Sequence, residues 1–368
     1  MRRSFDVEAL ENRQLLAAVY PSPYEQYMVE LNNWARMNPS AAAATYGVDV
    51  NEGPPAYPIS TSPAQPLAIN PNLMDASRTY AQFFFDSGAP FSHTADGRTW
   101  DQRMVAAGYI PSGSTESAQL HMGGSGPDTT LATANDFRNY YTDLSVPGRW
   151  HRMNMFGPSW KEVGSAVMNG TYQGWPGFIT VLDFAYSGTT SFLTGVAYSD
   201  TSHDNFYTPG EQMTGVQVKA IRNSDGATYS TTTWDSGGYS LALPPGTYTV
   251  WGSGGPFGPH NAVRYDNVTI GDQNVKRDFR PDYVNAQINP PAGKPVRAMG
   301  NPNVAVMPIL VPIGTIDLTT GTGLRAANTA APILSPSFPT GSVLVSLGQT
   351  TNNGVQDLNG GFGVLDLI

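Results

Sequence analysis

One stretch defines the first helix of the chain: Tyr27-Met28-Val29-Glu30-Leu31-Asn32-Asn33-Trp34-Ala35-Arg36-Met37-Asn38-Pro39. Tyr27, Leu31 and Trp34 recur at the spacing of one helix face, which predicts a buried apolar stripe. The pattern ends at Asn38-Pro39 because the residue before a proline disfavours the helical conformation. We therefore predict a helix over residues 23–37.

Further helices, and then strands, follow this segment. A second helix is predicted over residues 71–85, where Asn70 can cap the chain ahead of Pro71. A short helix within 101–108 would be closed by Gly108, and 131–144 is predicted to be helical again. Apolar and β-branched residues in 163–168 and 178–186 predict strands. Helices followed by strands indicate an α+β sandwich over residues 22–190.

The composition excludes several classes of protein. The 368 residues carry 29 acidic against 20 basic side chains, a net charge of −9, so a nucleic-acid binder is not expected. No run of residues approaches the length of a membrane span. The chain has no cysteine, which excludes disulfides, thiol nucleophiles and Cys-based zinc sites. No serine-hydrolase elbow, HExxH motif or P-loop is present, and no organic cofactor is expected.

Four ordered segments resemble bacterial CAP-superfamily domains, also called SCP-like domains. They are residues 27–39, the stretch from Phe91-Ser92-His93 to Ala107-Gly108-Tyr109, His151-Arg152-Met153-Asn154-Met155, and Trp160-Lys161-Glu162-Val163-Gly164. The resemblance implies an α-β-α sandwich with a cleft that holds two histidines and two acidic residues. Most members of this family bind sterols, lipids or partners rather than catalyse reactions, so the resemblance favours a binding protein over an enzyme.

The resemblance also suggests which residues line that cleft. His93 and His151 match the two histidines, and Glu116, in the degraded segment Thr115-Glu116-Ser117, matches one acid. For the second acid we choose Asp143, eight residues ahead of His151, with Glu162 as the alternative. His121 is either a further cleft residue or, as we favour, an exposed loop residue.

Such a cluster has three possible uses. Two imidazoles and two carboxylates can bind a divalent metal such as zinc through His93 and His151. The same groups can act as general acid and base, which would make the protein a metal-dependent, peptidase-like hydrolase. Alternatively, they only hydrogen-bond one another and hold loops in place. The 58 residues between the two histidines carry no metal signature by spacing alone.

Residues 191–283 have the pattern of a small all-β sandwich. Short runs at 214–221, 229–233, 239–243 and 247–251 alternate with turn signals such as Asn223-Ser224-Asp225-Gly226. The stretch 237–250 resembles prealbumin-like modules, including the B-type repeats of bacterial surface adhesins. That resemblance implies a spacer.

One segment of this unit has the ligand spacing of a calcium loop. Counted from Asp200, oxygen side chains stand at positions 1, 3, 5, 9 and 12, with a backbone carbonyl available at position 7. The proposed ligands are Asp200, Ser202, Asp204, Phe206 (through its carbonyl), Thr208 and Glu211. Bound calcium and an empty polar turn both remain open.

Residues 1–21 and 284–368 lie outside the two predicted units. In residues 1–21 the apolar run is interrupted by Glu8, Glu11 and Arg13, unlike an ordinary signal peptide, but 10–16 resembles a short N-terminal motif of exported bacterial proteins. Residues 284–368 are a Pro/Gly-rich linker and tail without a motif, in which 304–313 and 342–347 are possible strands. We predict a secreted or cell-surface binding protein with a lipid, glycan or protein ligand.

Overall fold

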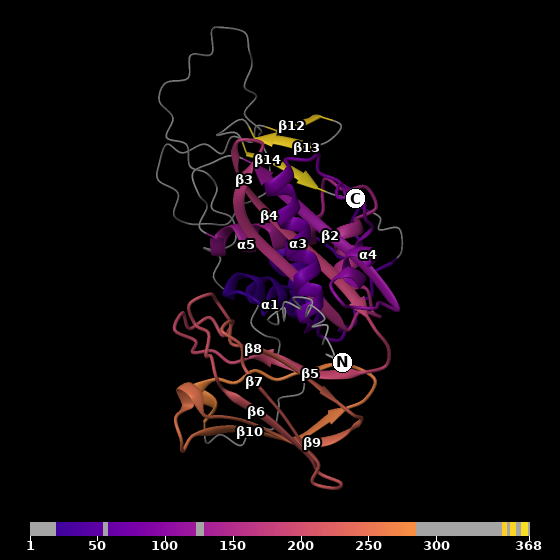
Figure 1. Cartoon of the computed structure of the whole chain (residues 1–368). Coiled ribbons are helices and arrows are strands. Elements are labelled where there is room, and N and C mark those ends of the chain that lie inside the picture. The colour runs from indigo at the N-terminus through magenta and orange to yellow at the C-terminus, as the bar shows by residue number, and fades with distance from the viewer. Residues whose placement is uncertain are drawn as a thin grey trace, which may run out of the picture.

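The computed structural model describes residues 20–53, 58–122 and 129–284, and the backbone of three short strands within 348–366. The possible strands at 304–313 and 342–347, and the N-terminal motif, lie outside the described residues. Figure 1 shows two parts, a large sheet flanked by helices and, below it, a smaller unit made of strands. No helix of the described part is long and apolar enough to cross a membrane.

Helix α1 (Pro23–Met37) has the predicted bounds, and its start is explained by a capping box. The Ser22 N–H donates to Glu25 Oε2 at 2.7 Å, and the Glu25 N–H donates to Ser22 Oγ at 3.3 Å. The predicted stop at Asn38 is confirmed, but a second helix, α2 (Pro39–Tyr46), begins at once. The sequence interpretation missed it, although proline is well tolerated at the first position of a helix.

The other helices largely follow prediction. Helix α3 (Pro71–Ser87) is capped by Asn70, whose side chain accepts from the Asn72 N–H at 2.9 Å. Helix α4 (Trp100–Ala106) is followed by Gly108 in the left-handed region, with φ +89°. Helix α5 (Thr129–Thr142) corresponds to the helix predicted over 131–144, whereas α6 (Trp150–Phe156) was not predicted.

The large sheet has the strand order β1-β3-β4-β2-β14-β13-β12. Its strands are β1 (Ala68–Ile69), β2 (Gly113–Met122), β3 (Glu162–Tyr172), β4 (Trp175–Tyr186), β12 (Gly348–Thr351), β13 (Gly354–Asp357) and β14 (Phe362–Asp366). Strands β3 and β4 were predicted and are longer than expected. Strand β2 was missed, because its alternation is of polar and small residues rather than of large apolar ones.

Helices cover both faces of this sheet. Leu182 and Phe184 of β4 belong to the same core cluster as residues of α1 and α5, whereas Ile179 and Val181 pack with Tyr80 and other residues of α3. Alternate residues of one strand therefore face different helix layers, as the pleat requires. The arrangement agrees with the expected mixed α/β fold, with helices on both sides of the sheet.

The smaller unit consists of two sheets around one hydrophobic core. One has the order β10-β9-β6-β7 and the other β11-β5-β8. The strands are β5 (Ser191–Val196), β6 (Gln217–Arg222), β7 (Thr228–Thr232), β8 (Gly238–Leu243), β9 (Gly246–Ser253), β10 (Ala262–Ile270) and β11 (Val275–Lys276). The predicted strands at 229–233, 239–243 and 247–251 are present, and the run at 214–221 forms a strand only from Gln217. The likeness to prealbumin-like modules stays a prediction.

The two units share a buried, partly charged junction. Glu30 of α1 lies 2.8 Å from Lys276 Nζ, which also pairs with Asp278. Burial raises the pKa of Glu30, and the charge of Lys276 offsets part of this rise. Phe206 also packs against Tyr27 of α1, with 6.1 Å between ring centroids. Phe206 and Lys276 therefore anchor the second unit to the first helix.

Removing the lysine of this junction should destabilise the protein strongly. Lys276→Ala leaves the Glu30 carboxylate buried without its cation, which we expect to cost about 3–5 kcal/mol of unfolding free energy. Urea unfolding of the full chain measures the effect. Lys219→Ala, in a half-exposed position on β6, is the matched control and should change stability by less than about 0.5 kcal/mol. An equal loss in both variants would contradict the assignment.

Gly164 lies where β3 packs against the backbone of α3. A Cβ at this position would lie 2.2 Å from the carbonyl carbon and oxygen of Leu73. Since neither backbone can move aside cheaply, Gly164→Ala should cost at least about 1–3 kcal/mol, seen as a lower urea midpoint. Gly271→Ala has no atom within 4 Å of its added methyl group and should leave the midpoint unchanged.

Candidate functional site

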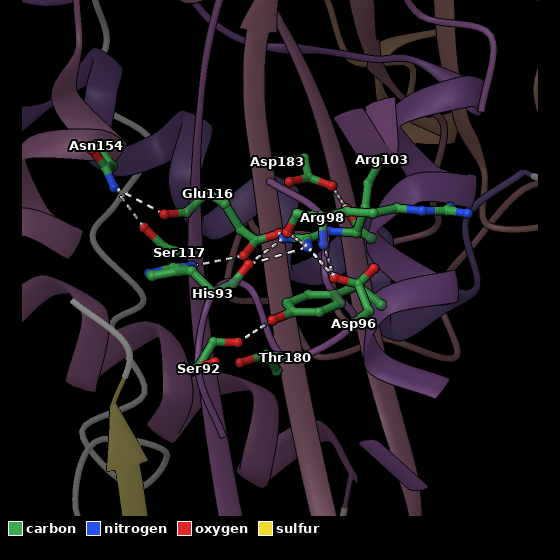
Figure 2. Close-up of polar contacts among 12 residues, drawn as sticks. Ser92, His93, Asp96, Arg98, Arg103, Glu116, Ser117, Asn154, Thr180 and Asp183 are labelled. Atoms are coloured by element: carbon green, nitrogen blue, oxygen red, sulfur yellow. Dashed lines mark hydrogen bonds and ion pairs between the residues drawn. The ribbon is translucent and has the colours of Figure 1, made fainter. Parts of the chain in front are cut away.

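Glu116 of β2 is the centre of a buried polar cluster on the α3/α4 side of the sheet. Its Oε1 lies 2.7 Å from His93 Nδ1, and its Oε2 accepts from Arg103 Nη2 at 2.6 Å. The Glu116 side chain is fully buried, while that of His93 keeps 14% of its surface exposed. Figure 2 shows these contacts as a continuous chain. Because Nδ1 is engaged by Glu116, the other ring nitrogen, Nε2, is the one that can meet a ligand.

Arg103 also holds the loop that carries His93. Its Nη1 donates to the carbonyl of His93 at 3.1 Å, to Asp96 Oδ1 at 2.9 Å and to the carbonyl of Arg98 at 3.0 Å. The guanidinium carbon lies 3.4 Å from the ring centroid of Tyr80, within the range of a cation–π contact. One side chain of α4 thus positions both the imidazole and its carboxylate.

Asp183 adds a second buried acid to the cluster. It stands opposite Glu116 in the β2–β4 ladder, and its Oδ2 accepts from Ser77 Oγ at 2.7 Å. Burial, and then the charge of Glu116, raise the pKa of Asp183 well above 3.8. A proton on Asp183 removes the repulsion between the two acids. Arg103 is then paired with two carboxylates, the buried Glu116 and the partly exposed Asp96.

The second predicted histidine pairs with the second predicted acid. His151 Nδ1 lies 3.0 Å from Asp143 Oδ1, and both side chains are almost fully buried. Asp143 Oδ2 also accepts from the backbone N–H of His151 at 2.9 Å and of Arg152 at 3.2 Å. Asp143 therefore fixes the first turn of α6 as well as the imidazole.

Glu162, the alternative acid, has other partners. Its carboxylate accepts from Asn70 Nδ2 at 2.7 Å, from the Tyr109 hydroxyl at 2.6 Å and from Ser187 Oγ at 3.2 Å. These bonds join the start of β3 to α3 and to the chain after α4. In the described part of the chain, Glu162 therefore bonds to residues that hold secondary-structure elements together, rather than to His93 or His151.

Asn154 connects the helix that carries His151 to β2 beside Glu116. Asn154, one turn after His151 on α6, donates to the Glu116 carbonyl at 3.2 Å and to Ser117 Oγ at 3.1 Å. Tyr140 packs edge-on against His151, with 5.2 Å between ring centroids. Neighbouring residues of a strand point to opposite faces, so the pair of His93 reaches β2 from the α3/α4 side and that of His151 from the α5/α6 side.

His121 is not the exposed loop residue that we favoured. It lies near the end of β2, half-buried, and pairs through Nε2 with Asp136 of α5. Asp136 in turn accepts from Thr180 Oγ1 at 2.7 Å. The prediction failed because strand β2 itself was not recognised.

His93 and His151 were predicted as possible zinc ligands. Within the described residues, no group of three or more histidine, aspartate or glutamate side chains is arranged to hold a metal ion. The acids nearest to His93 and His151 are engaged by the Nδ1 atoms of those histidines. Zinc binding through His93 and His151 therefore stays a prediction, and we derive no step through it.

In the predicted calcium loop, the carboxylates are bound by protein donors. Asp200 Oδ2 lies 2.9 Å from Arg280 Nη2 and also accepts from the Asn205 N–H. Glu211 accepts from the backbone N–H of Ser202 at 2.9 Å and of Thr208 at 3.0 Å. Burial raises the pKa of Asp204. Arg280 thus pairs with one of the proposed ligands, Asp200, and calcium binding stays a prediction.

A pocket of about 630 Å³ lies elsewhere, beside the junction of the two units. It is lined by residues 189–191, by the turn 242–245 between β8 and β9, and by Gly271 and Asp272. Lys161 donates to the carbonyl oxygens of Thr189, Thr190 and Asp272 and so ties two of these walls together. None of the predicted cleft residues lines it.

The site thus lies in a domain with helices on both faces of a sheet, where His93, from the chain between α3 and α4, contacts Glu116 of β2. Residues 29–184 match the family model "CAP: Cysteine-rich secretory protein family", so this part of the chain is a CAP-family domain. A search of curated proteins finds no match to the chain. Members of the CAP family are typically secreted.

Two residues of the cluster were not predicted. Asp183 carries a recognisable signal, a single acid inside the apolar strand sequence Val181-Leu182-Asp183-Phe184. Arg103 belongs to a segment used for the family resemblance, but its charge alone did not distinguish it from a surface arginine. Their burial in the structure identifies both residues as members of the cluster.

The raised pKa of Asp183 leads to a testable pH dependence. A carboxyl whose pKa is higher folded than unfolded loses stability as pH rises from about 4 to its folded pKa, because the unfolded chain releases the proton first. Asp183→Asn keeps the hydrogen bonds without the titration. Relative to wild type, the unfolding free energy of this variant should rise between pH 4 and pH 8, by about 1.4 kcal/mol for each unit of pKa shift, and its melting temperature should rise with it.

Melting curves of the full chain at several pH values test this expectation. Asp86→Asn, at an exposed position of the same helix layer, is the matched control and should follow wild type at every pH. A loss of stability in Asp183→Asn at pH 8 would show that Asp183 is charged in the folded protein.

Proposed function

We propose that this protein is an exported binding protein whose CAP domain presents the His93–Glu116 pair to a ligand. The observation that carries the proposal is the 2.7 Å contact between His93 Nδ1 and a buried Glu116 that is itself fixed by Arg103. This arrangement sets the ring orientation before any ligand arrives. The partly exposed imidazole is the polar group of the cluster best placed to meet a ligand.

The ligand class follows from the chemistry of that imidazole. When neutral and donating through Nδ1 to Glu116, His93 offers Nε2 as an acceptor. The complementary ligand carries hydroxyl or N–H donors, as glycans and peptides do. Arg103 is offset by both Glu116 and Asp96, so the cluster has no excess of positive charge, which favours a neutral ligand group over an anion. The β-sandwich, joined to α1 through Lys276, would act as a rigid spacer.

A binding screen with the full chain tests the proposal. Wild-type protein is applied to glycan and peptide arrays, and each hit is titrated against His93→Gln and against His260→Gln, an exposed histidine of the sandwich. Affinity should fall at least about tenfold in His93→Gln, consistent with the loss of a well-placed hydrogen bond, and stay unchanged in His260→Gln. Hits bound equally well by both variants would contradict the proposal.

The second candidate is a hydrolase, favoured by the same contact, because a carboxylate on Nδ1 is how many general bases are oriented. His93 Nε2 would then accept a proton from an attacking hydroxyl or water. Mass spectrometry of each hit after prolonged incubation separates the candidates. Cleavage that is lost in His93→Gln supports the hydrolase, and an intact ligand supports binding.

A further inference from the structure

The four-stranded sheet β10-β9-β6-β7 has one face in a hydrophobic core and the other turned away from the CAP domain. Its inward residues, such as Val218 and Val250, belong to the core of the smaller unit. The partner sheet of this unit lies next to the CAP domain, since Ser240 of β8 donates to the carbonyl of Ile69 in β1 at 3.0 Å. Figure 1 shows β6, β9 and β10 on the side of the smaller unit farther from the large sheet. The outward residues of the four strands therefore form a surface of their own, here called the outer sheet face.

A tryptophan lies between two cations on the outer sheet face. The strand register places Trp251 of β9 opposite Lys219 of β6 on one side and opposite Arg264 of β10 on the other. Ser230 of β7 stands opposite Lys219. Neighbouring strands are about 4.8 Å apart, so this row of four residues spans roughly 14 Å. All four are at least partly exposed, so the row presents an indole and two cationic side chains to solvent.

The two cations of this row differ in their partners. The guanidinium carbon of Arg264 lies 5.0 Å from the centroid of the Trp251 ring, and the same group pairs with Asp266 at 2.6 Å. These contacts restrain the indole. Within the described part of the chain, by contrast, the Lys219 ammonium group has no hydrogen-bond or ion-pair partner, unlike that of Lys276. Lys219 is therefore the cation of the row that is available to a ligand.

The charge of this sheet is opposite in sign to that of the unit that contains it. Residues 191–283 carry nine acidic and six basic side chains, a balance of −3. The four strands carry Lys219 and Arg264 against one acid, Asp266, and their third basic residue, Arg222, is paired with an acid of the following turn. Exposed charges interact over only about 8–10 Å at moderate salt, so this local balance governs what binds here. The outer sheet face therefore complements an anionic ligand.

The neutral side chains of this face favour a glycan as that ligand. Residues two positions apart on a strand share its face, which gives the outer sheet face the hydroxyl side chains of Thr228, Ser230, Thr232, Thr249 and Ser253. These groups both donate and accept hydrogen bonds, as the hydroxyls of a sugar do. The partly exposed indole offers a flat apolar surface to the C–H groups of a sugar ring.

We propose that the outer sheet face is a second binding surface of this protein and that it binds an acidic polysaccharide, one built with uronic-acid units. Trp251 packs against a sugar ring, and Lys219 pairs with a carboxylate of the same polymer. The surface lies on the β-sandwich, on the side away from the CAP domain, so binding here is independent of the His93 site. The β-sandwich then attaches the protein to an acidic glycan while the CAP domain stays free to bind its own ligand.

Titration of the full chain with uronic-acid polymers tests the proposal. The probes are polygalacturonate, alginate and hyaluronate, with methyl-esterified polygalacturonate as the uncharged control and poly-glutamate as the acidic peptide control. Wild-type protein should bind at least one of the three polymers, and should bind both controls at least about tenfold more weakly, since neither offers a carboxylate and a sugar ring together.

Substitutions then assign the binding to the outer sheet face. Trp251→Ala should lower the affinity at least about tenfold, whereas Trp175→Ala, at an exposed tryptophan of the β3–β4 hairpin, should leave it unchanged. Lys219→Gln should lower it about threefold, and Lys219→Arg, which keeps the charge, should restore it. Melting curves check that each variant is folded, and the two Lys219 variants keep the test decisive should Trp251→Ala unfold.

Three results would overturn the proposal: no binding of any of the three polymers, equally tight binding of either control, or equal losses in Trp175→Ala and Trp251→Ala. His93→Gln should bind the polymers like wild type, because the two surfaces lie on different units. An equal loss in His93→Gln would place the polymer at the histidine site and overturn the assignment to the sheet.

Discussion

The burial of α1 on almost every side is the constraint on which the rest of the structure depends. Its apolar residues pack into the main core, and its polar residues are buried as well, so each needs a partner. Asn33 exchanges two hydrogen bonds with the backbone of Leu67, and Arg36 donates to the carbonyls of Gln65, Met155 and Gly157. One helix thereby positions the strand entry, the end of α6 and, through Glu30, the second unit.

In the histidine site, too, buried polar groups require partners, and here the requirement is one of charge. Two acids face each other across β2 and β4, and a single guanidinium, Arg103, neutralises one of them. Keeping the other protonated avoids a second buried charge, which a low-dielectric interior strongly disfavours. The same arginine binds the loop of His93, so the geometry of the site and its electrostatics depend on one side chain.

Elements with a strong local pattern were predictable from sequence. Helix α1, helix α3 with its Asn70 cap and the apolar strands β3 and β4 appear close to their predicted positions, because capping and periodicity act within a few residues. Strand β2 was missed since Ser117, Gln119 and His121 are polar on one face. They are buried only because α5 and α6 cover them, and no local pattern records that cover.

The same distinction between local pattern and tertiary packing applies to the candidate site. The candidate residues came from the sequence by itself: His93, Glu116 and His151 from segments resembling one family, and Asp143 from its position eight residues ahead of His151. The tertiary structure decided their pairing, His93 with Glu116 and His151 with Asp143, and it brought Arg103 and Asp183 into the cluster. Pairing depends on which side chains share a face of the sheet and how deeply they are buried. Those are properties of strand register and packing between segments far apart in the chain, which residue identity and spacing do not encode.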